Sequence, residues 1–104
     1  MTKEYILSKL KALKPKYEKE GFIIFGIFGS VARDDSDENS DIDILYGIEA
    51  DKFCALYPGF KSFGRLKELK EELGSIFDRK IDLATANGNG KTFKEIALKD
   101  LIYV

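Results

Sequence analysis

The sequence predicts an α+β fold, in which a small mixed β-sheet is covered by helices. Two kinds of pattern alternate along its 104 residues: apolar residues at helical spacing, and short runs rich in β-branched and aromatic residues. The resulting order, helix–strand–helix–strand–helix–strand–helix, is typical of helices packed on a mixed sheet. Hydrophobic residues make up 44% and charged residues 34% of the chain, as in a globular protein. We therefore expect a single domain over residues 1–104.

The first helical segment contains a proline. Its apolar residues stand at gaps of four, three and four, and they are Ile6, Leu10, Leu13 and Tyr17. Because a proline inside a helix costs about 3 kcal/mol, we expect two pieces, with Pro15 in the first turn of the second. Gly21 is the predicted C-terminal stop.

Two strands are predicted on either side of a polar loop. Residues 22–28 form a continuous apolar run of the length of a buried strand. We expect residues 31–33 to form one helical turn with Ser30 as its N-cap, and residues 34–40 to form the loop. Residues 41–46 alternate between polar and aliphatic side chains, which indicates the second strand. Residues 49–60 have no clear pattern apart from a turn at Pro58-Gly59.

The second half of the chain repeats the alternation. A third amphipathic helix is indicated by Phe63, Leu66, Leu69, Leu73 and Phe77. We expect Gly74 to weaken or end this helix. Residues 80–84 are the predicted third strand, and Thr92 with Glu95 forms a capping box that opens a last helix over residues 93–98.

Composition and charge exclude several classes of protein. The net charge of −1 argues against a broadly basic nucleic-acid binder. The chain has no histidine, so catalytic triads that depend on it and His-ligated zinc are excluded. No apolar run is long enough to span a bilayer, and the N-terminus lacks the apolar stretch of a signal peptide. Cys54 is the single cysteine, and we expect the reducing environment of the cytoplasm.

Two aspartates of the second predicted strand are candidate metal ligands. Asp41 and Asp43 are two residues apart, so a strand places both carboxylates on the same face. Such a pair is repulsive unless a cation lies between the two groups, and oxygen ligands alone favour Mg²⁺ or Mn²⁺. The alternative for Asp41, taken alone, is an acidic loop residue that directly precedes a strand and has no role in metal binding.

A Gly-Ser pair before them is a candidate phosphate site. Gly29 lets the backbone approach a phosphate closely, and Ser30 adds a hydroxyl donor. If the two strands are neighbours, this turn and the carboxylate pair face each other. Arg33 is a candidate phosphate contact. The alternatives are an ordinary turn at Gly29-Ser30 and a solvated charge at Arg33.

Asp82 is a third candidate carboxylate. It is flanked by aliphatic residues in the third predicted strand, as Asp43 is in the second. A carboxylate in apolar surroundings is costly unless it is paired or binds a metal. Asp82 could ligate a metal and accept the proton of an attacking hydroxyl. The alternative is a surface pair with Arg79 or Lys80.

These residues resemble the signature of a known superfamily. The segments Gly29-Ser30-Val31-Ala32-Arg33 and Ser40-Asp41-Ile42-Asp43-Ile44 are similar to those of the DNA polymerase β-like nucleotidyltransferases. Within that superfamily, the chain resembles the minimal nucleotidyltransferases, the MntA-type antitoxins encoded beside HepT-type toxins. One departure is the acidic loop over residues 34–38, where relatives more often have glycine and proline.

The resemblance implies a fold, a reaction and a partner. It implies the polymerase β-like fold, with two Mg²⁺ ions held by Asp41, Asp43 and Asp82. It implies transfer of a nucleoside monophosphate from a nucleoside triphosphate, with release of pyrophosphate. For MntA-type members the donor is ATP and the acceptor is a tyrosine of the partner toxin, a HEPN-class ribonuclease silenced by adenylylation. We therefore expect a hetero-oligomer with a HepT-like toxin.

Two other functions remain open. The chain could mask a toxin by contact alone, through the apolar residues 53–57 and 101–104, although core packing explains them equally well. It could also transfer the nucleotide to a small-molecule hydroxyl or an RNA end. RNA is the weaker choice, because binding to its backbone needs clustered Lys and Arg.

Overall fold

A mixed four-stranded sheet forms the centre of the computed structural model, which describes residues 2–35, 37, 39–85 and 99–104. The described strands are β1 (Phe22–Phe28), β2 (Ile42–Ile48), β3 (Ile81–Thr85) and β4 (Ile102–Tyr103). Their order in space is β3-β2-β1-β4. β1 is antiparallel to both β2 and β4, whereas β2 and β3 are parallel. The predicted α+β fold with a mixed sheet is confirmed.

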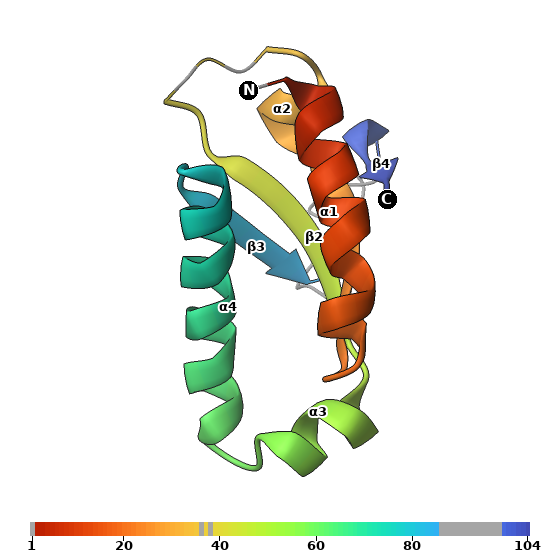
Figure 1. Cartoon of the computed structure of the whole chain (residues 1–104), viewed down its shortest axis with the longest axis vertical. Helices are drawn as coiled ribbons and strands as arrows, with labels where there is room; N and C mark the ends of the chain where they lie inside the picture. The colour runs from red at the N-terminus through yellow and green to blue at the C-terminus, as the bar shows by residue number, and fades with distance from the viewer. Residues whose placement is uncertain (1, 36, 38, 86–98) are drawn as a thin grey trace.

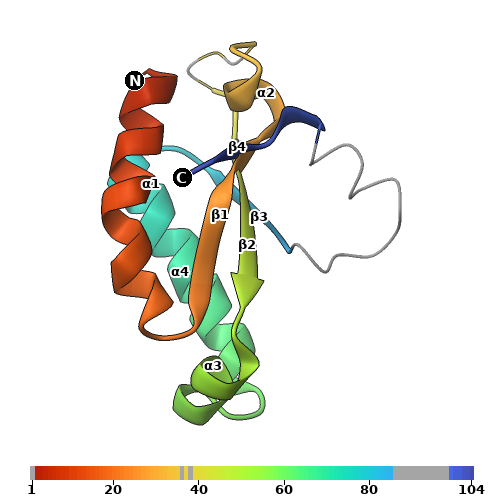
Figure 2. The same cartoon turned by 90° about the vertical axis from the view of Figure 1, so that its right-hand side faces the viewer.

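The two long helices lie on the same face of the sheet (Figures 1 and 2). They are α1 (Lys3–Glu18) and α4 (Lys61–Phe77), and the shorter helices are α2 (Gly29–Ala32) and α3 (Ala50–Leu56). α3 and α4 form the crossover that parallel β2 and β3 require. α2 and the site lie at one end of the molecule, and α3 lies at the other (Figure 1).

The core lies between the sheet and the two long helices. Its largest fully buried side chains include Tyr17, Phe22, Phe53 and Phe77. The Phe22 ring stacks on Tyr46 at 4.9 Å between centroids and meets Tyr17 edge-on at 6.0 Å. These contacts join α1 to β1 and β2 at the ends of the two strands that lie away from Gly29 and Asp43.

The prediction that α1 divides at Pro15 is wrong. The helix runs without interruption from Lys3 to Glu18, with Thr2 as its N-cap, and Gly21 follows it with a φ of +90°. Pro15 and Lys11 are both exposed. Proline has no N–H, so the carbonyl of Lys11 loses its usual hydrogen bond within the helix. Because this part of the helix faces solvent, water can bind that carbonyl instead.

The turn after β1 differs from the prediction in its cap. α2 begins at Gly29 with Phe28 as its N-cap, so Ser30 lies inside the turn and the predicted N-cap is wrong. Arg33 is the C-cap, and its amide donates to the carbonyl of Gly29. The positive φ of Gly29, +75°, goes with a turn that starts two residues earlier than the cap preference of serine suggests.

The expected weakening or end of the third helix at Gly74 is also wrong. α4 continues to Phe77 and ends at Asp78, which adopts a left-handed conformation. The residues on either side, Leu73 and Phe77, are fully buried. Burial of each contributes about 2 kcal/mol, which exceeds the cost of about 1 kcal/mol for a glycine in a helix.

The strands follow the predictions with small shifts. β1 has the predicted bounds, β2 begins one residue after Asp41, and β3 is shifted by one residue. α3 and β4 were not predicted; β4 has only two residues and forms against Gly26, where a Cβ would lie 2.0 Å from the carbonyl oxygen of Ile102. The predicted last helix, with its capping box at Thr92 and Glu95, lies outside the described residues.

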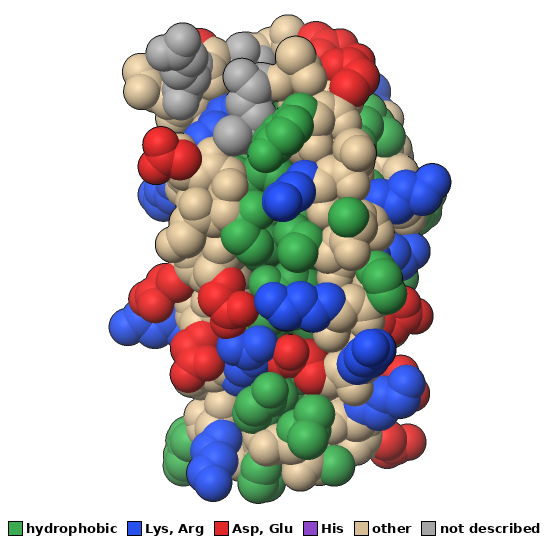
Figure 3. Space-filling view, in the orientation of Figure 1, with side chains coloured by type: hydrophobic (Ala, Val, Ile, Leu, Met, Phe, Trp, Pro, Cys, Tyr) green, Lys and Arg blue, Asp and Glu red, His purple; other side chains and the backbone are tan. Residues whose placement is uncertain are grey.

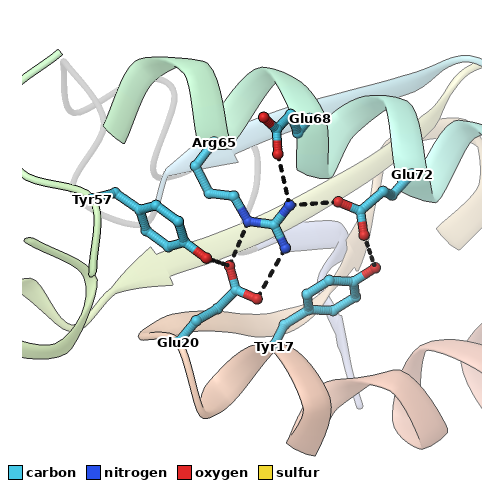
Figure 4. Close-up of polar contacts among 6 residues, drawn as sticks. All are labelled: Tyr17, Glu20, Tyr57, Arg65, Glu68 and Glu72. Atoms are coloured by element: carbon cyan, nitrogen blue, oxygen red, sulfur yellow. Dashed lines mark hydrogen bonds and ion pairs between the residues drawn. The ribbon is translucent and has the colours of Figure 1, made fainter. Parts of the chain in front are cut away.

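A network of charged and aromatic side chains joins α1, α3 and α4 at the end distant from the site (Figure 4). The guanidinium of Arg65 contacts both carboxylate oxygens of Glu20, at 2.6 and 3.0 Å, and one oxygen of Glu72 at 2.6 Å. Tyr57 donates to Glu20, and Tyr17 donates to Glu72. This network adds polar contacts between the three helices to the apolar core that they share.

The surface around α3 is apolar (Figure 3). Leu56, Phe60 and Phe63 are 56%, 90% and 70% exposed, whereas Phe53 is buried in the core. In the tail, Ile102 and Val104 pack against the core and Tyr103 is exposed. Among the described residues, no helix is both long and apolar enough to cross a membrane.

Candidate active site

Two aspartates face each other where β2 and β3 begin. In the parallel register Asp43 lies opposite Asp82, and the negative charge of Asp82 acts on the carboxyl group of Asp43. Ile42 and Ile44 are fully buried on the helix-covered face, so alternation along β2 puts Asp43 on the opposite face. The two carboxyl groups therefore form one cluster of negative charge at the start of the two strands.

The surroundings of Asp43 disfavour its charge. Burial, together with the negative charges of Asp82 and Asp41, raises the pKa of Asp43 from 3.8 to about 6, and the positive charge of Arg33 opposes this effect. Such a perturbed carboxyl group, next to further carboxylates, is typical of a functional site. A bound cation would remove the repulsion.

Asp41 lies near this pair but outside the strand. It is half-buried, directly before β2, and its carboxylate is 3.9 Å from the ammonium group of Lys80. The loop before it is held by Arg79, which donates to the backbone carbonyls of Asp37 and Ser40. The two cations proposed as surface partners of Asp82 therefore contact the start of β2 instead.

Gly29 is in direct contact with the carboxylate of Asp43. β1 and β2 pair so that Phe28 is opposite Asp43, which brings the next residue against its side chain. A Cβ on Gly29 would lie 2.2 Å from Oδ2 of Asp43. A side chain there would require the Asp43 carboxylate to move, and the left-handed φ of +75° also favours glycine. The predicted juxtaposition of the Gly-Ser turn and the carboxylates is observed.

Arg33 is held by two acids that sequence reasoning did not select. Its Nε is 2.8 Å from Asp35, and its Nη1 is 2.8 Å from Asp100. The alternative of a purely solvated charge does not describe this arrangement. Asp100 is 67 residues away in sequence, and no local pattern connects it to Arg33.

The donor set fits a hard divalent cation, although the three carboxylates do not converge on one point. Among the described residues, no group of three His, Cys, Asp or Glu side chains has the arrangement of a ready metal site. Asp43 and Asp82 are nevertheless paired, and Asp41 adds to their negative potential. Carboxylate oxygens with room for phosphate and water are the environment that Mg²⁺ uses. The ligation of metal by all three stays a prediction.

Comparison with protein families identifies the chain. The family model for polymerase beta nucleotidyltransferases matches residues 9–104. The chain belongs to the polymerase β nucleotidyltransferase family. This membership supports nucleotidyl transfer as the activity of the chain.

Relatives of this nucleotidyltransferase carry more specific names. Three proteins of Methanocaldococcus jannaschii, provisionally named protein adenylyltransferases, are each 35% identical over 103 residues, which are 98% of this chain and 93% of each relative. The protein adenylyltransferase MntA of Thermococcus cleftensis is 30% identical over 105 residues, with 100% of this chain and 97% of the relative covered.

A solved structure with the provisional title of a minimal nucleotidyltransferase has the same fold as this nucleotidyltransferase. Its TM-score is 0.73 at 24% sequence identity, and the match covers 100% of this chain and 97% of the other. At this level of identity the likeness establishes the fold alone. The polymerase β-like fold implied by the sequence resemblance is confirmed.

Proposed function

We propose that this nucleotidyltransferase transfers AMP from ATP to a tyrosine hydroxyl of a partner toxin, a HEPN-class ribonuclease, and so acts as its antitoxin. The observation that carries the proposal is the packing of Gly29 against Asp43, which is itself paired with Asp82. This arrangement places a phosphate-binding turn directly beside a carboxylate site. Relatives named protein adenylyltransferases support AMP as the transferred group and a protein as the acceptor.

Each residue of the site has a distinct role in the proposal. Asp41, Asp43 and Asp82 hold two Mg²⁺ ions, which supply positive charge to the triphosphate when they are bound. The backbone of Gly29 and the hydroxyl of Ser30 bind the β- and γ-phosphates.

The proposed reaction is an in-line displacement at the α-phosphorus. The tyrosine oxygen forms a bond to the α-phosphorus, and the bond from that phosphorus to the bridging oxygen of the β-phosphate breaks. Pyrophosphate leaves with the bonding electrons. The proton of the tyrosine hydroxyl passes to Asp82, which is exposed and therefore accessible to an incoming acceptor.

Incubation with ATP, Mg²⁺ and the partner tests this proposal. ATP labelled on the α-phosphate should label the partner, and ATP labelled on the γ-phosphate should not. The Asp41→Asn/Asp43→Asn variant should lose this labelling. A matched control, Asp51→Asn/Glu71→Gln, changes the same charge at exposed positions on α3 and α4 and should retain it. Equal labelling by the Asp41→Asn/Asp43→Asn variant, or label found only on RNA or a small molecule, would contradict the proposal.

A second candidate function is masking of the toxin by contact alone. It is favoured by the exposed apolar side chains of Leu56, Phe60 and Phe63, which a partner could cover. The two functions differ in their dependence on the site. Neutralisation of the toxin that survives replacement of Asp41, Asp43 and Asp82 by asparagine would favour masking, and its loss would favour transfer.

A further inference from the structure

The side chain of Arg33 is fixed from two directions beside the site. Asp35 contacts its Nε and Asp100 contacts its Nη1, each at 2.8 Å. Asp35 is held in turn by the backbone, since its amide donates to the carbonyl of Ser30 at 2.9 Å. Asp100 belongs to the C-terminal segment shortly before β4, and its side chain is only 18% exposed. The orientation of the guanidinium is therefore determined by groups that are themselves well placed.

These two contacts leave Arg33 able to bind an anion. A guanidinium has more donors than the two ion pairs use, and within the described part of the chain its Nη2 makes no hydrogen bond. Arg33 also lies close enough to Asp43 for its charge to act on that carboxylate. Arg33 is the C-cap of α2, the turn that begins with Gly29 and Ser30, where the proposed function places the β- and γ-phosphates.

We infer that Asp100 is a positioning residue, which together with Asp35 holds Arg33 ready to bind the triphosphate of the substrate. The inference rests on the proposed function. A free arginine side chain loses rotamer entropy when it binds a phosphate, and the ion pairs impose that loss before the nucleotide arrives. Both acids also add negative charge near the phosphates. They are partly exposed, so solvent and salt screen this repulsion.

Calorimetric titration of the full chain with ATP and MgCl₂, without an acceptor, tests the inference. Asp100→Ala should raise the Kd for ATP by about tenfold, which corresponds to the entropic cost of immobilising one long side chain. Asp100→Asn should raise it less, because its amide oxygen still accepts from Nη1. The same ratios are expected with inorganic tripolyphosphate, because Arg33 contacts the phosphates and not the base.

A matched control and a double variant separate positioning from general charge or folding effects. Asp34 is in the same loop and makes an ion pair of the same length, 2.8 Å, but with Lys3. Asp34→Ala should therefore leave the Kd unchanged. In an Arg33→Ala background, Asp100→Ala should have no further effect. Circular dichroism and the Tm show whether each variant is folded.

Each outcome has a defined consequence. If the wild-type chain binds ATP and folded Asp100→Ala and Asp100→Asn variants bind it equally well or more tightly, the positioning role is wrong and the proposed function stands. Equal weakening by Asp100→Ala with and without Arg33 also overturns the positioning role. If the wild-type chain binds neither ATP nor tripolyphosphate, the proposed function and the inference both fail.

Discussion

The carboxylate of Asp43 lies between the backbone of Gly29 and the carboxylate of Asp82, half-buried in the sheet. Its folded-state pKa of about 6 is above the ordinary value of 3.8 because burial and two neighbouring acids disfavour the charge. A raised carboxyl pKa means that the folded chain binds more protons than the unfolded chain between these values. This group therefore lowers the free energy of unfolding as the pH rises from about 4 to about 6.

Replacement of Asp43 by asparagine should stabilise the metal-free protein while it abolishes transfer. The full shift corresponds to roughly 3 kcal/mol, and partial exposure reduces the expected gain to about 1 kcal/mol at about pH 7. The gain should fall to near zero at about pH 3, where the wild-type carboxyl is mostly protonated in both states. Urea unfolding in EDTA at both pH values measures it. A variant less stable than the wild type at the higher pH would show that the charge of Asp43 is not destabilising.

Gly29→Ala tests the contact between the turn and the carboxylate. The added Cβ would lie 2.2 Å from Oδ2 of Asp43 at a φ of +75°, so we expect a loss of about 2 kcal/mol or more in unfolding free energy, together with loss of transfer. Gly59→Ala is the matched control. Gly59 also has a positive φ, +61°, but nothing lies within 4 Å of the added Cβ, so only the backbone cost of about 1 kcal/mol remains. Equal losses in chemical denaturation would mean that the contact with Asp43 has no cost of its own.

At the scale of the elements, the helices are joined by Arg65 as well as by apolar packing. Its side chain is 14% exposed, and the pKa of Glu20 is lowered chiefly by the hydrogen bond from Arg65. A partly buried pair of this kind is costly to break from one side, because the remaining carboxylates keep their charge without a partner. The network therefore matters more to stability than a surface ion pair does.

Arg65→Ala should lower the unfolding free energy by about 2–3 kcal/mol, with a fall in Tm of roughly 10–20 °C. Lys52→Ala serves as the control, since Lys52 and Glu49 form an exposed pair at 3.4 Å that is worth less than about 0.5 kcal/mol. Differential scanning calorimetry compares the two variants. Similar shifts for both would show that the network adds nothing beyond ordinary surface pairing.

Helices and strands with a clear pattern of buried apolar residues could be predicted from the sequence. Features that depend on packing between distant parts of the chain could not. β1 was predicted with its bounds because its residues form a continuous apolar run. Pro15 and Gly74 were read as breaks, but tertiary packing on buried side chains outweighs their local cost. β4 has two residues and exists only because Gly26 lets it approach β1.

One part of the candidate site could be predicted from the sequence, and another part could not. The pairing of Asp43 with Asp82 follows from their equivalent positions in two strands, which the sequence displays as similar aliphatic settings. The contact between Arg33 and Asp100 depends on the placement of the C-terminal segment beside α2, and no spacing in the sequence reports it.

At the scale of the whole molecule, the two ends have different characters. One end carries α2, and the other end carries α3 and the apolar surface around it (Figures 1 and 3). The two ends are separated along the longest axis of the molecule, which measures 38 Å, so they are distinct surfaces.

Intact mass spectrometry of the partner, after incubation with the chain, ATP and Mg²⁺, tests the central claim most directly. We expect a mass increase equal to AMP or a multiple of it, located on a tyrosine by peptide mapping. The increase should be absent in EDTA and with Asp41→Asn/Asp43→Asn. A partner whose mass is unchanged while the wild-type chain still neutralises it would contradict the claim that this site acts by nucleotidyl transfer.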